Sequence, residues 1–197
     1  GNQQRGGAGS SQRRRQVAEA PGALPALVAA VATFSGGAAA GCAGALANIA
    51  RFGFGGRVAE VPGALPALVE AAAGGGAAAH DSAAALKFIA GAPERARRVA
   101  EVPGALPALV AAVSAGRYAA FDGAWALANI ARTEPGLAWR VAEAPGALPA
   151  MAAAVASGPS CVADKCADVL GYIAKADPRL AQRVAEAPGA LPALVAA

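Results

Sequence analysis

The sequence has few of the side chains that build catalytic and metal centres. It contains one histidine and three cysteines among 197 residues. Because three is an odd number in a chain of this length, we predict no disulfide framework and a reducing environment. Cys161 and Cys166 stand five positions apart, which on a helix turns them about 140° from each other and argues against a shared metal ion. A metal site or histidine-based nucleophile would need His80, next to Asp81, where a solvated helix start is the simpler interpretation.

Other catalytic signatures are missing as well. No GxxxxGK[ST] phosphate-binding loop occurs, and the run "GFGG" at residues 53–56 lacks both the glycine spacing and the preceding strand of a dinucleotide site. We therefore predict that the chain is not an enzyme and uses no cofactor.

The sequence also lacks an excess of charge outside its first residues. The formal net charge is +4, but Arg5 and residues 13–15 account for four of the 17 basic residues. From residue 16 onward, 13 basic and 13 acidic residues balance. A surface that follows nucleic-acid phosphates needs clustered Lys and Arg, so we predict no nucleic-acid partner.

One stretch is uncharged and long enough to span a bilayer. It covers residues 20–50, which is 31 residues. Pro-Gly and Gly-Gly pairs interrupt it, and its apolar residues are mostly alanine. We interpret it as core helices and predict no membrane insertion. The first residues carry charge but no apolar segment, so no secretory signal peptide is expected.

What the chain does contain is alanine and repetition. Hydrophobic residues make up 56% of the sequence, and alanine, the best helix former, favours an all-helical fold. The segment "VAEAPGALPALVAA" returns five times with few changes. The prolines that open its PGALP core are Pro21, Pro62, Pro103, Pro145 and Pro188. Their spacings of 41, 41, 42 and 43 residues indicate a solenoid of stacked repeats.

Each repeat predicts three helices. The first is short and ends at the Pro-Gly pair, which breaks the helix and turns the chain. The second begins near the inner proline and carries an apolar stripe, in the first unit Leu24, Leu27, Val28 and Val31. The third covers residues 38–51, 77–90, 117–132 and 160–175, with a Leu-x-x-Ile pair recurring on its core face. On the first helices, Arg–Glu pairs three residues apart, such as Arg98 and Glu101, predict a solvated edge of weak ion pairs.

The sequences of the predicted second and third helices resemble those of a known family. "GALPALV" followed by "WALANIA" at residues 125–131 resembles the armadillo repeat, as in importin-α, β-catenin and the vacuolar armadillo proteins. The resemblance covers about residues 13–197. It implies an all-α, right-handed α-solenoid with units near 13–53, 54–93, 94–134 and 135–176, and a partial unit at 177–197. Residues 1–12, which have no apolar stripe, are expected to be a disordered tail.

Comparison among the repeats points to the third helices as the binding surface. The PGALP region barely varies, whereas the third helices differ at nearly every polar position. In armadillo proteins these helices line the concave face, and the resemblance implies that their exposed columns form a groove. The candidate groove residues are Asn48, Asp81, Ala84, Phe88, Asp122, Trp125, Asn129, Asp168 and Tyr172.

The resemblance also gives roles to two of these residue types. Proteins like importin-α use a Trp and an Asn four residues later, the Asn amide bonding a peptide backbone and the Trp packing basic side chains. Only Trp125 and Asn129 form the full pair. An alternative is that Asn48 and Asn129 satisfy carbonyl groups near their own helix ends and that Trp125 is partly core. Another set of equivalent positions in the third helices, occupied by Cys42, Ser82, Gly123 and Cys166, forms a column that is expected to hold small core residues.

The sequence therefore predicts an intracellular scaffold, cytoplasmic or nuclear, that binds an extended protein or peptide segment in this groove. We expect the protein to be a monomer. We also expect a mildly basic ligand, because four aspartates lie near the groove. One alternative is a nuclear transport adaptor like importin-α. The other is the substrate-recruiting region of a larger enzyme such as a ubiquitin ligase.

Overall fold

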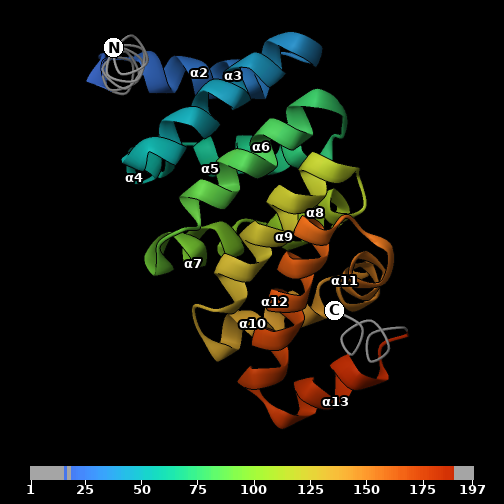
Figure 1. Ribbon diagram of the computed structural model, residues 1–197. Coiled ribbons are helices and arrows are strands. Elements are labelled where there is room, and N and C mark those ends of the chain that lie inside the picture. The colour runs from blue at the N-terminus through green and yellow to red at the C-terminus, as the bar shows by residue number, and fades with distance from the viewer. Residues whose placement is uncertain (1–15, 17–18, 189–197) are drawn as a thin grey trace, which may run out of the picture.

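The computed structural model describes residue 16 and residues 19–188, and throughout this part the regular structure is helical (Figure 1). The predictions for residues 1–12 and for a second helix in the fifth unit lie outside the described residues. No helix within 19–188 is long and apolar enough to cross a membrane.

The helices fall into the three classes that the repeats predict. The first helices are α4 (Gly55–Glu60), α7 (Pro93–Glu101), α10 (Pro135–Glu143) and α13 (Pro178–Glu186). The second helices are α2 (Ala23–Thr33), α5 (Ala64–Ala73), α8 (Ala105–Val113) and α11 (Ala147–Ser157). The third helices are α3 (Gly36–Ile49), α6 (Gly76–Ile89), α9 (Arg117–Ala131) and α12 (Ser160–Ala176).

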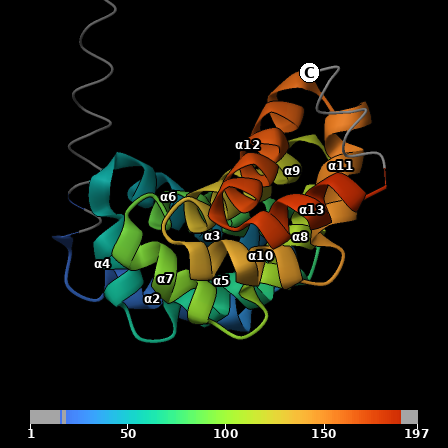
Figure 2. The same cartoon turned by 90° about the horizontal axis from the view of Figure 1, so that it is seen from below.

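Equivalent helices of successive repeats pack on one another. Helix α3 packs on α6, α6 on α9, and α9 on α12, while α2, α5, α8 and α11 form a parallel row. In Figure 1 the third helices run down the middle of the molecule from blue to orange. Figure 2 shows α6, α9 and α12 above the second helices α2 and α5. The stacked helices make the solenoid that the 41-residue period predicts.

The Pro-Gly pair turns the chain in the same way in each repeat. Gly63 and Gly104 precede second helices and have φ values of 78° and 80°, in the left-handed region. A side chain is unfavourable at such a φ, so glycine is the residue that allows this turn. The second helix begins two residues before the inner proline, which then lies in the first turn, where its missing N–H has no intrahelical acceptor.

The predicted apolar stripes form the core. Leu46 and Ile49 of α3 are buried, and so are the equivalent pairs in α6, α9 and α12. On α2, Leu24, Val28 and Val31 are buried, whereas Leu27 is half-buried. Burying one such side chain stabilises the fold by about 1.5–3 kcal/mol. Because each stripe is covered by the next repeat, the core runs the length of the stack.

The small-residue column behaves as predicted at three of its four positions. Ser82 and Cys166 are fully buried. A Cβ atom at Gly123 would lie 2.8 Å from the Leu109 carbonyl oxygen, so α9 approaches α8 too closely there for a larger residue. Cys42 is only half-buried.

The junction between the first two repeats differs from the others. We predicted a third helix reaching residue 51, but α3 ends at Ile49 and continues as a π-helical turn, η1 (Ala50–Phe54). Gly53 leaves the helical region, with φ of 98°. The later first helices begin with a proline, which fixes their start. Helix α4 begins with Gly55 instead, so no residue enforces a clean break.

The first helices are joined by arginines rather than by the predicted ion pairs. Among the described residues, none of the Arg–Glu pairs three residues apart is an ion pair. Three of these arginines, Arg98, Arg140 and Arg183, instead donate to a main-chain carbonyl near the end of the preceding first helix. The bonds run from Arg98 to Ala59 at 2.7 Å, from Arg140 to Ala100 at 2.8 Å and from Arg183 to Ala142 at 3.5 Å. Arg98 and Arg140 are exposed and Arg183 is half-buried. Their hydrogen bonds link one repeat to the next.

Candidate functional site

A hollow of about 460 Å³ lies between α3, α6 and α9 on the third-helix face. It combines aromatic and charged side chains from three successive repeats. Other hollows, at the turns between second and third helices, are lined mainly by alanine and glycine. Six of the predicted groove residues line the mixed hollow: Asn48, Asp81, Ala84, Phe88, Asp122 and Trp125. Asn129, Asp168 and Tyr172 lie beyond its lining.

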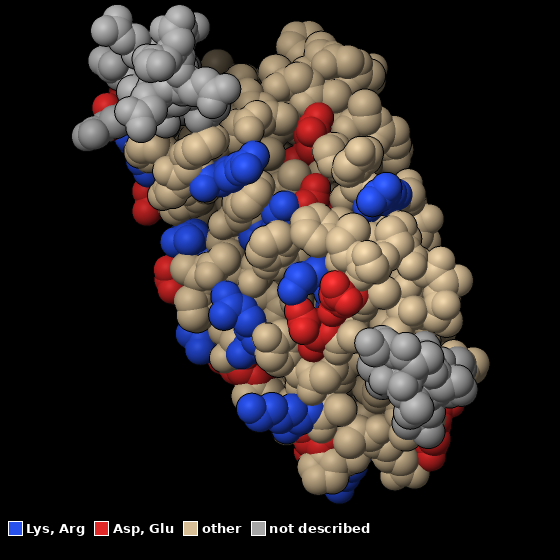
Figure 3. Space-filling view, in the orientation of Figure 1, with Lys and Arg blue, Asp and Glu red and all other residues tan. Residues whose placement is uncertain are grey.

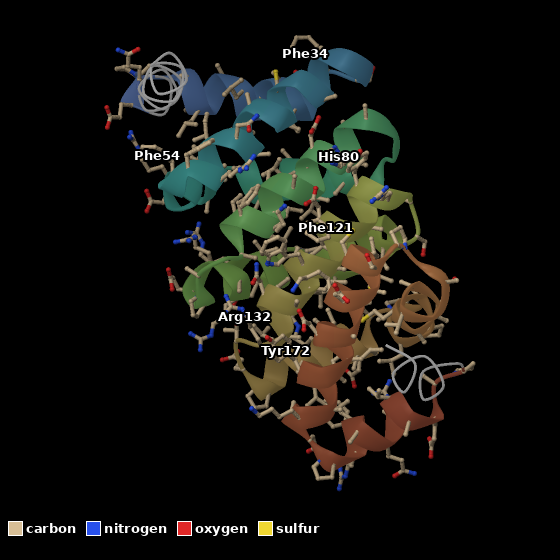
Figure 4. The ribbon with its side chains drawn as sticks, viewed as in Figure 1. Phe34, Phe54, His80, Phe121, Arg132 and Tyr172 are labelled. Atoms are coloured by element: carbon tan, nitrogen blue, oxygen red, sulfur yellow. The ribbon has the colours of Figure 1, made fainter. Side chains whose placement is uncertain are left out.

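Charged side chains follow the same face. Figure 3 shows one band of them down the middle, over the third helices, and another down the edge formed by the first helices. Figure 4 shows His80, Phe121 and Tyr172 following one another down this face, from α6, α9 and α12.

Lys87, at the back of the hollow, is surrounded by aromatic rings. Its Nζ lies 4.2 Å from the ring centre of Phe88, 5.0 Å from that of Trp125 and 5.4 Å from that of Phe121. Phe121 and Trp125 meet edge to face, with ring centres 5.3 Å apart. A cation within about 6 Å of a ring centre is attracted by the electrons of its face. Three rings therefore stabilise one ammonium group.

Asp122 provides the negative charge for this group. Its Oδ1 accepts a hydrogen bond from Lys87 Nζ at 2.5 Å, and the two side chains are only 8% and 9% exposed. His80 Nε2 lies 3.4 Å from Asp122 Oδ2, and its Nδ1 lies 3.3 Å from Asp81 Oδ1. His80 thus lies between two aspartates. Its side chain is 40% exposed, so it keeps the contact with solvent predicted for it.

The other described lysine near Trp125 comes from the following repeat. Lys165 Nζ lies 5.6 Å from the Trp125 ring centre and donates to Asp168 Oδ2 at 2.5 Å. Trp125 is 38% exposed, so it is neither a free platform nor a core residue. The carboxylate of Asp168 and the ring of Trp125 both have partners within the chain.

The two asparagines of the predicted groove occupy different environments. Asn129 is buried; its Nδ2 donates to the Lys87 carbonyl oxygen at 3.2 Å, and its Oδ1 accepts from Arg132 Nε at 3.1 Å. Asn48 is exposed, and its Nδ2 donates to the Gly44 carbonyl one turn earlier at 3.0 Å. Asn129 therefore links α9 to α6. Asn48 bonds a carbonyl of its own helix, as the alternative interpretation has it, and also lines the hollow.

The chain is similar to solved structures of designed proteins. One, described as computationally designed armadillo repeat proteins for modular peptide recognition, is 25% identical, with a TM-score of 0.80 over 96% of this chain and 84% of that chain. A designed armadillo repeat protein in complex with the peptide (KR)4 is 26% identical, with a TM-score of 0.79 and the same coverage. An engineered protein is also 26% identical, with a TM-score of 0.79 over 100% of this chain and 86% of that one.

The chain has the armadillo repeat fold. This confirms the predicted all-α solenoid. No family model and no curated protein matches the sequence.

One column of the armadillo array reaches back from each repeat to the third helix before it. It is the column three residues before the Trp125 position. The Asp81 carboxylate packs over Gly44, with Cγ 3.4 Å from where a Cβ would lie. Asp122 meets Lys87, and Lys165 covers Trp125. At three successive junctions, this column thus places Asp81 over a glycine, pairs Asp122 with a buried lysine and brings Lys165 near a tryptophan ring.

Lys87 and Phe121 are parts of the site that the sequence prediction missed. A signal for Lys87 was present, because the equivalent residues of the other repeats are Ala47, Ala128 and Gly171. A lysine among small residues indicates a position where one repeat does something that the others do not. Phe121 had no comparable signal, since its column also holds alanine, histidine and aspartate.

No three His, Cys, Asp or Glu side chains within 19–188 gather closely enough to hold a metal ion. Burial raises the pKa of the Cys166 thiol to about 12, so this cysteine is neutral at physiological pH and a poor nucleophile.

Proposed function

We propose that this armadillo array is a non-enzymatic scaffold that binds an extended protein or peptide segment along its third-helix groove. The observation that supports this most is the hollow between α3, α6 and α9, where three repeats contribute aromatic and polar side chains to one open surface. The similar structures add support, because one is described as built for modular peptide recognition and another is in complex with a peptide.

An extended ligand suits the spacing of the helices. Packed helices lie roughly 8–10 Å apart, and an extended chain advances about 3.3 Å per residue. About every third residue of a ligand would then meet the next third helix. Aromatic residues at such a surface, here Phe88 and Tyr172, tend to contribute most to affinity. Asn48 supplies an amide donor and acceptor for the main chain of the ligand.

The two alternative functions have less support. The nuclear-adaptor hypothesis requires a Trp–Asn pair that is free to bind a ligand. Both the nitrogen and the oxygen of the Asn129 amide are hydrogen-bonded within the chain. The Trp125 ring has a lysine near it from the preceding repeat and another from the following repeat. Nothing in the described residues favours a ubiquitin-ligase role in particular. We further propose that the protein acts as a monomer inside the cell, in the cytoplasm or nucleus, where its three free thiols would persist.

A peptide-display selection on the purified protein tests the proposal. The strongest selected peptide should bind Phe88→Ala at least about 30-fold more weakly than wild type, a loss of about 2 kcal/mol. Asn48→Ala should weaken binding to unrelated peptide sequences to a similar extent, because it removes a main-chain contact. Circular dichroism confirms that each variant is folded.

Tyr118→Ala is the matched control. Tyr118 is also a third-helix aromatic and is 72% exposed, but it lies at the turn edge, outside the hollow. Its removal should leave affinity unchanged. Binding that survives Phe88→Ala and Asn48→Ala, but is lost in Tyr118→Ala or on changing Arg98 and Arg140, would place the site elsewhere and refute the proposal.

A further inference from the structure

The environment of Lys87 is that of a bound cationic ligand. Its ammonium group touches three aromatic rings and a carboxylate, Asp122, and the side chain is only 9% exposed. Aromatic rings combined with a carboxylate are the groups that recognise lysine, arginine and alkylammonium ligands. In this chain Lys87, a residue of the groove itself, occupies the position that such a ligand would take.

On Trp125, too, a residue of the chain lies where a cationic ligand would bind. Lys165, from the next repeat, lies 5.6 Å from the ring centre, and Asp168 neutralises it. The two aspartates that favoured a basic ligand, Asp122 and Asp168, are therefore each paired with a lysine of the chain. The other two charged residues that line the hollow are Arg51, which is exposed, and Asp81, which is half-buried. These are opposite in sign.

We infer that Lys87 is a built-in occupant of the groove's cation site, and that it makes the groove select segments with an uncharged residue opposite Trp125. This inference rests on the proposed function for its consequence, the choice of ligand, but the occupied cation site stands independently of it. A lysine or arginine of the ligand at that position would lie close to Lys87 and Lys165, and the like-charge repulsion would weaken its binding.

Removing Lys87 should open the site to an external cation. Lys87→Ala deletes the side chain beyond Cβ, and propylammonium supplies the same missing atoms. Propylammonium should therefore raise the melting temperature of Lys87→Ala in a saturable way, since a ligand that binds only the folded state stabilises it. Propanol, which has the same shape without the charge, should have no such effect.

Two controls separate a cation site from a general effect of amines. Wild type, whose site is filled, should not respond to propylammonium. Lys87→Ala/Asp122→Asn, which keeps the cavity but lacks its negative charge, should not respond either. An equal rise in all three proteins, or no rise in Lys87→Ala, overturns the inference.

A peptide measurement then tests ligand choice. A peptide of alternating lysine and arginine should bind Lys87→Ala at least tenfold more tightly than it binds wild type. Adding Trp125→Ala to Lys87→Ala should remove that gain. Equal or tighter binding by wild type contradicts the selectivity.

A measurement on wild type covers the case in which Lys87→Ala does not fold. The ¹⁵N signal of the Lys87 ammonium should be visible at neutral pH, because a buried and paired ammonium exchanges its protons slowly, and the lysine–arginine peptide should leave it unshifted. Displacement of the signal by the peptide overturns the inference. If no peptide binds any variant while propylammonium still stabilises Lys87→Ala, the cation site is upheld and the peptide-binding function fails.

Discussion

The junction between α6 and α9 and the junction between α3 and α6 are built from the same apolar columns. Leu86 and Ile89 are fully buried at the first, and Leu46 and Ile49 are buried at the second. The polar contacts differ. Between α6 and α9, Lys87 pairs with Asp122, and Asn129 donates to the carbonyl of Lys87.

Between α3 and α6 there is no comparable link among the described residues. Asp81 packs over Gly44, and the Asn48 amide turns back to its own helix. The apolar columns are common to both junctions, whereas the polar columns decide whether two third helices are also joined by side-chain hydrogen bonds. We call the α6–α9 junction, which has such bonds, locked, and the α3–α6 junction open. The hollow spans both junctions, and the Lys87–Asp122 link lines it on the α6–α9 side.

The largest effect should come from the shared apolar column. Leu109→Ala removes a fully buried side chain of α8 and should lower the free energy of unfolding by roughly 2–5 kcal/mol. Leu68→Ala, the equivalent change in α5, should cost the same to within about 1 kcal/mol, because both junctions use this column alike. Urea denaturation measures both. A loss under about 1 kcal/mol for Leu109 would contradict the assignment of α8 to the core.

Breaking the charged link should rank next. Lys87→Met leaves Asp122 buried without its main partner and should cost about 2–3 kcal/mol, less than a fully isolated buried charge because His80 stays near. Lys87→Met/Asp122→Asn should recover most of the loss. At the open junction, Asp81→Asn should cost less than about 1 kcal/mol, since Asp81 is partly exposed. Equal losses for Lys87→Met and Asp81→Asn would show that the junctions are not differently locked.

The two asparagines sharpen the comparison further. Asn129→Ala removes a bond between α9 and α6 and strands the Lys87 carbonyl, which should cost about 1–2 kcal/mol. Asn48→Ala should stay within about 0.5 kcal/mol of wild type, because its amide bonds its own exposed turn. Thermal unfolding measures both variants, and a reversed order would remove the distinction between a structural and a binding asparagine.

The smallest effects belong to the small-residue column. The Ser82 hydroxyl is buried and has no hydrogen-bond partner, so Ser82→Cys should stabilise the protein by about 1 kcal/mol. Cys166→Ser places a hydroxyl in the equivalent position of α12 and should destabilise it by about the same amount. Changes of the same sign in the two variants would mean that the column is not uniform.

Helix positions and the apolar stripes could be predicted because each depends on residues close in sequence. Pro-Gly pairs end helices locally, and the Leu-x-x-Ile pairs report one face of one helix. The short contacts of Asp122 and Asn129 could not be predicted in the same way. Their partner lies 35 and 42 residues earlier, respectively. A column shows which residues share a face but not how far a side chain reaches.

The prediction of charge preference shows the same limit. The aspartates near the groove favoured a mildly basic ligand, but a count of charged residues does not show which of them are paired within the chain. Asp122 and Asp168 have lysine partners in the structure. Comparing Lys87 with its small counterparts in other repeats was the step that could have revealed the first of these pairs.

The arginine bonds between first helices give the stack a direction. Ala59, Ala100 and Ala142, whose carbonyls accept these bonds, are buried. Detaching the following repeat leaves such a carbonyl without its donor, whereas detaching the preceding repeat leaves a long guanidinium side chain that water readily surrounds. Each repeat is thus completed by the one that follows it. Removing a repeat from the C-terminal side would therefore leave a carbonyl group unbonded, whereas removing one from the N-terminal side would leave an arginine side chain unbonded.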